Sequence, residues 1–413
     1  MAANTLNDNV TMPASWRAKA PLLLAIGLCG VLVSLGLFHF GSSPENEATG
    51  FRMFFHSYLA NYIYCLSFCL GALFFVLVQH VVRAGWSATV RRVAELLAYT
   101  IPFWAVLFAP ILVAVFTNHG HLYEWSKGAG EIPAIVEMKL DYLNPGWFLF
   151  RAVVYFAIWC VAARLYFRMS REQDETGSTE ITLKLQRWAG PFIIMFALAL
   201  NFAAFDWVMS TDAEWYSTIF GVYIFAAGML SFFAVMILTC YMMQRNGRME
   251  KYVNTEHYHD LAKFQFGFIV FWSYIAFSQF LLYWYANIPE ETLWYKHRLD
   301  LSTGWRPLAY LLIALHFAVP FLGTLPRAVR RNKNLLAGWA CFILVVHWLD
   351  MTFLVMPNVG PASFMMLLGH FVCWIGMVSI FLAFFMYRVG ETPMVATRDP
   401  WLPDSLAYQQ MPM

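Results

Sequence analysis

Ten long apolar stretches alternate with short polar segments along the chain. A transmembrane helix needs about 20 mostly apolar residues, and each stretch meets this length. The separators carry Pro, Gly and charged residues, as is typical of loops. Continuous hydrophobicity, without alternation at every second residue, predicts an all-α integral membrane protein and not an outer-membrane barrel. The predicted spans are 20–40, 58–82, 94–116, 146–167, 188–209, 218–243, 262–286, 304–326, 336–356 and 362–387.

The composition excludes a set of soluble domains. Of 413 residues, 60% are hydrophobic and 13% charged, against about 45–50% and about 25% in an ordinary globular protein. The net charge of +2 gives no reason to expect a nucleic-acid partner. The first 19 residues are polar and no cleavage pattern follows the first apolar run, so we expect no cleavable signal.

The distribution of basic residues predicts the orientation. Twenty of the 27 Lys and Arg residues fall in the two tails and the even-numbered loops, and five fall on the other side. Basic residues collect on the cytoplasmic side of membrane proteins. The multi-pass chain is therefore expected to have a cytoplasmic N-terminal tail (1–19) and a cytoplasmic C-terminal tail (388–413). The C-terminal tail, with four prolines, is interpreted as a strap over a neighbour or as disorder.

An internal repeat is suggested by the ends of spans 5 and 9. Each carries one aspartate in its outer half, Asp206 and Asp350, which are 144 residues or four spans apart. An even number of spans preserves orientation, so the repeat predicts two parallel four-helix bundles. The predicted organisation is 20–57 (peripheral span 1 and outer loop), 58–209 (first bundle), 210–361 (second bundle) and 362–387 (peripheral span 10). The outer loop 117–145 is expected to hold a short interfacial helix around 132–141.

Ionisable residues inside the apolar spans are the main candidates for function. A charged group in hydrocarbon is costly unless it is paired, protonated or hydrated, and such residues often mark proton pathways. The candidates for a proton pathway are the acids Asp206, Asp350 and Glu95, the histidines His316, His347, His370 and His80, and Arg83.

Spans 8, 9 and 10 place several of these candidates at similar depth. His347 and Asp350 are three residues apart and share a helix face. Pro320 cannot bond the carbonyl of His316, which leaves that oxygen free for a side chain or water. If the three helices converge, His316, His347, Asp350 and His370 form one polar chain. Proton relay, a structural polar knot and ligand binding all remain open interpretations, and a haem site lacks its bis-histidine motif.

Two further collections lie near the ends of the spans. On the outer side, His56, Tyr58, Arg151 and Trp207 could bind a quinone, although an aromatic belt at the membrane interface explains the Trp and Tyr equally well. On the inner side, His80, Arg83 and Glu95 suggest a proton entrance. A basic segment that stops the span, with an interfacial Trp, is the alternative.

The seven cysteines give no sign of a bound redox centre. The chain has no CxxC, no CxxCH and no clustered ferredoxin-type spacing. Cys65 and Cys69 lie one helical turn apart, which fits ordinary packing better than a redox or metal pair. No metal site and no covalently bound cofactor is predicted.

Several strings resemble the polysulfide-reductase/NrfD type of membrane subunit, and more closely the shorter of the two such subunits in bacterial alternative complex III. The resemblance covers about residues 20–387. It rests on Phe55-His56-Ser57-Tyr58-Leu59, Gly71-Ala72-Leu73-Phe74-Phe75, Gln79-His80-Val81-Val82-Arg83-Ala84-Gly85-Trp86, Arg91-Arg92-Val93-Ala94-Glu95, Phe205-Asp206-Trp207-Val208-Met209-Ser210-Thr211-Asp212 and Trp215-Tyr216-Ser217-Thr218-Ile219-Phe220-Gly221-Val222-Tyr223.

The resemblance implies a bacterial inner-membrane subunit of a complex that oxidises menaquinol or ubiquinol and reduces cytochrome c or a terminal oxidase. The implied partners are a longer paralogous membrane subunit, an iron–sulfur/molybdopterin-like periplasmic subunit and multihaem cytochrome c subunits, which would hold the haem c and the iron–sulfur clusters. The family's quinol region maps here onto His56, Tyr58, Arg151 and Asp206. The longer paralogue is the stronger quinol-site candidate, so the buried acid and histidine route carries over best to this chain.

Two other function classes fit the sequence less closely. A secondary transporter would use the repeat and the buried charges, but it usually has inverted repeats and helices broken at the midplane. This repeat is parallel, and Pro320 is the one proline expected well inside a span. The third class is a structural scaffold of a respiratory complex, in which Asp206 and Asp350 would serve assembly alone.

Overall fold

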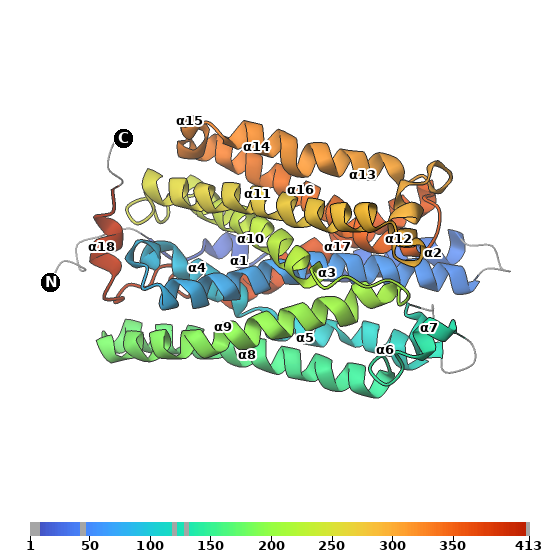
Figure 1. Ribbon diagram of the computed structural model, residues 1–413. Coiled ribbons are helices and arrows are strands. Elements are labelled where there is room, and N and C mark those ends of the chain that lie inside the picture. Colours follow the sequence, from blue (N-terminus) through green and yellow to red (C-terminus); the bar gives the residue numbers. More distant parts are fainter. Residues whose placement is uncertain (1–8, 42–46, 118–121, 128–131, 410–413) are drawn as a thin grey trace.

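Ten helical spans cross the molecule side by side in the computed structural model, which describes residues 9–41, 47–117, 122–127 and 132–409 (Figure 1). The all-α membrane fold with ten spans is confirmed. The spans are α2 (Ala20–Gly41), α3 (Glu47–Val81), α4 (Ala88–Ala98) with α5 (Ile101–Leu107) and α6 (Ala109–Thr117), α8 (Pro145–Thr176), α9 (Thr179–Trp207), α10 (Phe220–Arg245), α11 (Thr255–Ala286), α13 (Arg306–Leu312) with the π-helix Ile313–Ala318 and α14 (Val319–Thr324), α16 (Lys333–Val355) and α17 (Phe364–Val389).

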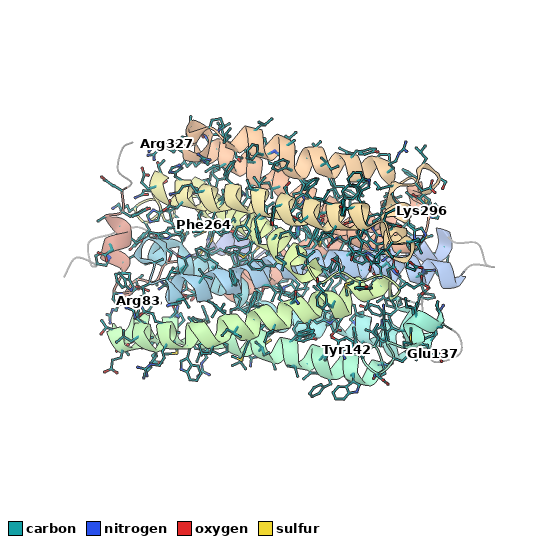
Figure 2. All side chains as sticks on the ribbon, viewed as in Figure 1. Arg83, Glu137, Tyr142, Phe264, Lys296 and Arg327 are labelled. Carbon is teal, nitrogen blue, oxygen red and sulfur yellow. The ribbon has the colours of Figure 1, made fainter. Side chains whose placement is uncertain are left out.

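Both ends of the described chain lie at the same end of the molecule, which we call the inner end because the sequence predicts it to be cytoplasmic (Figure 1). Arg83 and Arg327 lie at this end, and Glu137, Tyr142 and Lys296 lie at the opposite, outer end (Figure 2). The prediction that loops 83–93 and 327–335 share one side therefore agrees with the positions of Arg83 and Arg327.

The helices pack as two groups of four with one pair at the side. Helices α3, α4–α6, α8 and α9 pack together, and α10, α11, α13–α14 and α16 form the second group. The two groups meet where α10 packs against α3 and α9, and where α16 packs against α3. Most side chains of α3 and α10 are therefore buried. Peripheral helices α2 and α17 pair closely because Gly27, Gly30 and Gly376 let their backbones approach.

Proline interrupts two spans. Span 3 is divided into three helices because Pro102 and Pro110 lack the N–H groups that would continue the hydrogen-bond ladder. Span 8 changes to a π-helix over Ile313–Ala318, directly before Pro320. The expectation that Pro320 alone interrupts a span is therefore wrong.

The segments between the spans also fold. The outer loop forms only one turn of helix, α7 (Ala134–Glu137), which is shorter than the expected 132–141. A helix absent from the prediction, α12 (Pro289–Leu299), covers the outer end of the second bundle. The C-terminal tail, described to residue 409, is a strap, but it lies over the chain's own inner loops and contains the short helix α18 (Leu402–Leu406).

Candidate functional site

Asp206 is held in an ion pair at the outer end of the first bundle. It is the second-last residue of α9 and is fully buried. Arg151 of α8 contacts both carboxylate oxygens, from Nε at 2.7 Å and from Nη2 at 3.1 Å. The hydroxyl of Tyr155 donates a third hydrogen bond at 2.7 Å. A bidentate guanidinium satisfies the charge and the geometry of a carboxylate together, so this aspartate is held in place by its ion pair.

The surroundings of Arg151 reinforce this pair. The guanidinium donates to the carbonyl of Tyr142 at 2.9 Å and lies 3.8 Å from the centre of the Tyr142 ring. Burial and the neighbouring Asp206 charge raise the pKa of Tyr142 to about 12, so its hydroxyl stays neutral. Trp207 is buried beneath this site among Phe108, Phe156 and other aromatic rings.

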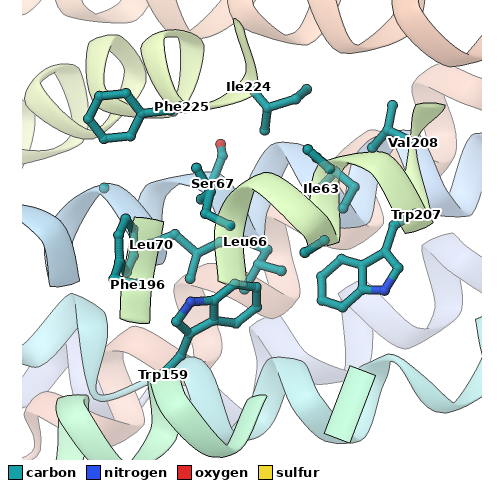
Figure 3. A pocket seen from close by; sticks show the side chains of 15 residues that line it. Ile63, Leu66, Ser67, Leu70, Trp159, Phe196, Trp207, Val208, Ile224 and Phe225 are labelled. Carbon is teal, nitrogen blue, oxygen red and sulfur yellow. The ribbon is translucent and has the colours of Figure 1, made fainter. Parts of the chain in front are cut away.

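The expected quinone-binding residues do not meet at one cavity. His56 donates from Nδ1 to the carbonyl of Arg52 at 2.8 Å, and Tyr58 donates to the carbonyl of Leu107 at 2.7 Å. Trp207 lines a cavity of about 30 Å³ at the junction of α3, α9 and α10, whose lining includes none of the other three residues (Figure 3). This volume holds a water molecule and is far too small for a quinone ring. Three of the four residues use polar groups on other parts of the protein: His56 and Tyr58 on backbone carbonyls and Arg151 on Asp206, whereas Nε1 of Trp207 has no hydrogen-bond partner among the described residues.

Asp350 has a different environment in the second bundle. It lies five residues before the end of α16, whereas Asp206 lies one residue before the end of α9. Asp350 is therefore about 6 Å farther from the end of its helix than Asp206 is. The hydroxyl of Tyr223, on α10, donates to Oδ1 at 2.5 Å. The other oxygen, Oδ2, accepts no hydrogen bond in the described part of the chain and lies 3.9 Å from Nδ1 of His316. No Lys or Arg of the described residues forms an ion pair with this fully buried carboxyl group.

His316 reaches Asp350 from the interrupted span. Pro320 would pair with the carbonyl of His316 in an α-helix, and the missing N–H favours the π-helix that carries this histidine. Both ring nitrogens lack a hydrogen-bond partner among the described residues, and the ring centre lies 3.7 Å from that of Trp272 on α11. Single-turn π-helices inside α-helices are frequent at functional sites. Asp350 and His316 are thus a buried acid and base that face each other with unused hydrogen-bonding capacity.

His347 and His370 point toward α3 instead of joining this pair. Nε2 of His347 lies 3.0 Å from the hydroxyl of Ser67, on α3. His370 is held between Ser57, on α3, at 2.9 Å and Thr352, on α16, at 2.8 Å. The expected chain of four groups is therefore divided, because α3 supplies its own hydroxyls to two of the histidines.

A polar row on α11 was missed by the sequence analysis. Four side chains at seven-residue spacing face the interior of the second bundle, and all are at least 95% buried: Tyr258, Gln265, Trp272 and Gln279. From Tyr258 to Gln279 the row spans about 32 Å, close to the hydrocarbon thickness of about 30 Å. Both amide atoms of Gln265 lack a partner among the described residues. The seven-residue repeat of polar residues was a signal in the sequence, and Asp350 with His316 lies beside Trp272 in this row.

Of the three inner candidates, Glu95 belongs to a charge network with residues that were not predicted. Glu95 is paired with Arg92 at 2.9 Å and with Arg91 at 3.5 Å, and Arg92 also contacts Asp174 at 2.8 Å. Asp399 of the strap pairs with Arg91. Glu95 is therefore held in a buried network of ion pairs.

The other two inner candidates, His80 and Arg83, do not belong to this network. His80 is buried beside Tyr166, and its Nε2 has no hydrogen-bond partner among the described residues. Arg83 is exposed in the turn after α3, at a positive φ of 52°. His80 is thus a buried candidate for the proton pathway, whereas Arg83 lies at the surface of the inner end.

The comparisons with known proteins add no family. Neither a protein-family model nor a curated protein matches the chain. Within the described residues, no group of three His, Cys, Asp or Glu side chains could hold a metal ion. The chemistry that the described site supports is proton exchange between Asp350 and His316.

Proposed function

We propose that this chain is a membrane subunit of a quinol-oxidising respiratory complex of the alternative complex III type, and that its second bundle conducts protons across the membrane. The resemblance of the Asp206 and Arg83 strings suggests the complex. The observation that carries the proton pathway is the buried Asp350, which has no cation partner and faces His316 at 3.9 Å.

The environment of Asp350 suits a group that gains and loses a proton. A charged carboxylate in hydrocarbon costs several kcal/mol unless it is compensated. Among the described residues, Asp350 has a hydrogen bond from the Tyr223 hydroxyl but no ion pair with a Lys or Arg. Within the part of the chain that the structure describes, neither ring nitrogen of His316 has a hydrogen-bond partner, so His316 can accept a proton from Asp350 and release one on its other side. A small rotation or one water molecule closes the 3.9 Å gap.

The row on α11 provides a route to and from this pair. Gln265 lies about 10 Å inward of Trp272, and Tyr258 lies a further 10 Å inward. At the inner end, Tyr258 and Lys333 both donate to Oε1 of Gln244 at 3.2 Å. At the outer end, Gln279 contacts Ser217 and Tyr295 at 3.1 Å. These groups can hold and orient water along the interior of the bundle.

The proposed partners divide the chemistry with this chain. Because His56, Tyr58 and Arg151 donate hydrogen bonds to other groups of the chain, the proposal assigns quinol oxidation to the longer paralogous subunit. The iron–sulfur/molybdopterin-like and multihaem subunits would carry the electrons in the periplasm of a bacterial inner membrane. This chain would contribute the proton pathway and the contacts that hold the subunits together.

The test is the Asp350→Asn variant in the assembled complex, reconstituted into vesicles. Asn keeps the size and the hydrogen bond from Tyr223 but cannot release a proton. We expect the number of protons translocated per electron to fall at least tenfold while the complex assembles normally. A variant with an unchanged ratio would disprove the pathway. Uptake of a solute by the purified wild-type chain alone in liposomes would favour a transporter instead.

A further inference from the structure

A groove opens on the membrane-facing side of the second bundle, in the inner half of the molecule. Its volume is about 680 Å³, within the range of about 300–1,000 Å³ that is typical of ligand sites. We call it the inner-leaflet groove. It is lined by Phe74, Trp86, Phe225, Asp260, Lys263, Phe264, Gly267, Phe268, Phe271 and Tyr408.

The length of the groove matches one leaflet of a bilayer. Along α11 it runs from Asp260 to Phe271, which is about 16 Å at 1.5 Å per residue. This is about half of the hydrocarbon thickness of about 30 Å. A transmembrane helix of a partner would need the full thickness, whereas the acyl chains of a lipid reach only to the midplane.

The two ends of the groove differ in polarity. The midplane end is lined by phenylalanines, and Phe264 stacks between Trp86 and Phe233 nearer the inner end (Figure 2). The inner end holds Lys263, whose side chain is 47% exposed and whose Nζ uses one contact with Asp260. Because an ammonium group has three donors, Lys263 can also bind an anion. Trp at this depth is typical of the headgroup region.

We propose that the inner-leaflet groove binds one anionic phospholipid, with its phosphate at Lys263 and an acyl chain along Gly267. Basic pockets between helices on the cytoplasmic side suit anionic headgroups. Phe74 of α3 and Phe225 of α10 form the inner wall of the groove, and their ring centres lie 4.7 Å apart. The bound lipid would therefore cover the contact between the two bundles.

Gly267 provides a way to fill the groove without disturbing the fold. A Cβ atom added there meets no atom within 4 Å. Gly338, on α16, is also an exposed helical glycine with the same free space, but it lies outside the groove. Leucine is a better helix former than glycine, so both Gly→Leu variants should fold at least as well as the wild type.

The experiment is native mass spectrometry of the full-length chain, titrated with phosphatidylglycerol and phosphatidylcholine of identical acyl chains. We expect one tightly held phosphatidylglycerol on the wild type and on Gly338→Leu, and its loss from Gly267→Leu. Lys263→Gln should keep a lipid but lose about fivefold in preference for phosphatidylglycerol, since a basic residue at the membrane surface contributes about 1 kcal/mol.

Four outcomes would overturn the proposal. The first is equal lipid binding by Gly267→Leu and the wild type. The second is equal loss in both Gly→Leu variants, which would indicate a general effect of leucine on the surface. The third is a Lys263→Gln variant with unchanged headgroup preference. The fourth is a partner polypeptide that cross-links to the groove. The melting temperature of each variant is measured as a control, so that a change in lipid binding can be distinguished from misfolding. Proton translocation does not enter the readout, so this test is independent of the proposed function.

Discussion

Asp206 and Asp350 are both aspartates near the outer ends of helices that run in the same direction, but a cation contacts only the first of them among the described residues. Asp206 is neutralised by Arg151 with two contacts of 2.7 and 3.1 Å. Asp350 has a neutral tyrosine on one oxygen and a histidine 3.9 Å from the other. A buried carboxylate paired with a guanidinium has little reason to change protonation, whereas one without a cation can exchange its proton with a neighbouring base. Asp206 is therefore the aspartate in an ion pair, and Asp350 is the one that the proposed proton pathway uses.

The second bundle also has a buried arginine, Arg298, which forms no ion pair with Asp350. Arg298 of α12 donates to the carbonyls of Phe353 and Leu354 at 3.0 and 2.7 Å, near the end of α16, and lies 3.5 Å from the ring centre of Trp294. Burial lowers the pKa of Arg298 to about 9, which still leaves it charged at neutral pH. A cation is favourable at a helix C-terminus. The positive charge at this end therefore stabilises the helix and leaves Asp350 unpaired.

The largest effect on stability is expected from Arg151→Gln. The substitution leaves Asp206 buried without its cation, which should cost about 3–5 kcal/mol. The measurement is the melting temperature of the purified chain and the yield of assembled complex. The double variant Arg151→Gln/Asp206→Asn removes both charges and should recover much of the loss. A single variant with the melting temperature of the wild type would contradict the structural role of the pair.

Arg298→Gln should have the next largest effect. It removes charge-assisted hydrogen bonds to backbone carbonyls, each worth about 1.5–3 kcal/mol, and we expect a net loss of about 2–3 kcal/mol. Denaturant unfolding would measure it. If this variant costs more than Arg151→Gln, the bidentate pair is not the main support of the outer end.

The sequence predicts the spans because their signal is local, but it predicts the site only in part. Hydrophobicity locates each span, although α3 begins eleven residues before its predicted bound, α9 begins nine residues before, and α8 ends nine residues after. The prolines at 102 and 110 could have predicted the breaks in span 3. Asp350, His316 and Asp206 were found because charge in hydrocarbon is rare. The partners of these residues were not predicted, because pairing with Arg151 or Tyr223 depends on helix rotation and on contacts across the bundles. For the same reason, the sequence did not predict that His347 and His370 face α3.

Tyr223→Phe tests how much the one hydrogen bond to Asp350 contributes. Loss of a buried hydrogen bond should cost about 1 kcal/mol, less than either arginine variant. Because the charged form of Asp350 loses its single donor, we also expect slower proton translocation. Tyr155→Phe is the matched control at Asp206, where Arg151 still balances the charge, and it should leave translocation unchanged. Equal effects of the two variants on translocation would remove the distinction between the bundles.

Pro320→Ala should have the smallest effect on stability, within about 1 kcal/mol. Alanine supplies the missing N–H, so the π-helix at Ile313–Ala318 should return to a regular α-helix and turn His316 away from Asp350. We expect fewer protons per electron with a nearly unchanged melting temperature. Full translocation in this variant would show that the π-helix does not position the histidine.

The most direct test of the account is infrared difference spectroscopy of the assembled complex during turnover, in the region of the protonated carboxyl group. The account predicts a band that reports a carboxyl group gaining or losing a proton, that disappears in Asp350→Asn and that persists in Asp206→Asn. A band that survives in Asp350→Asn and is lost in Asp206→Asn would contradict the account, because the paired aspartate would then be the one that exchanges protons.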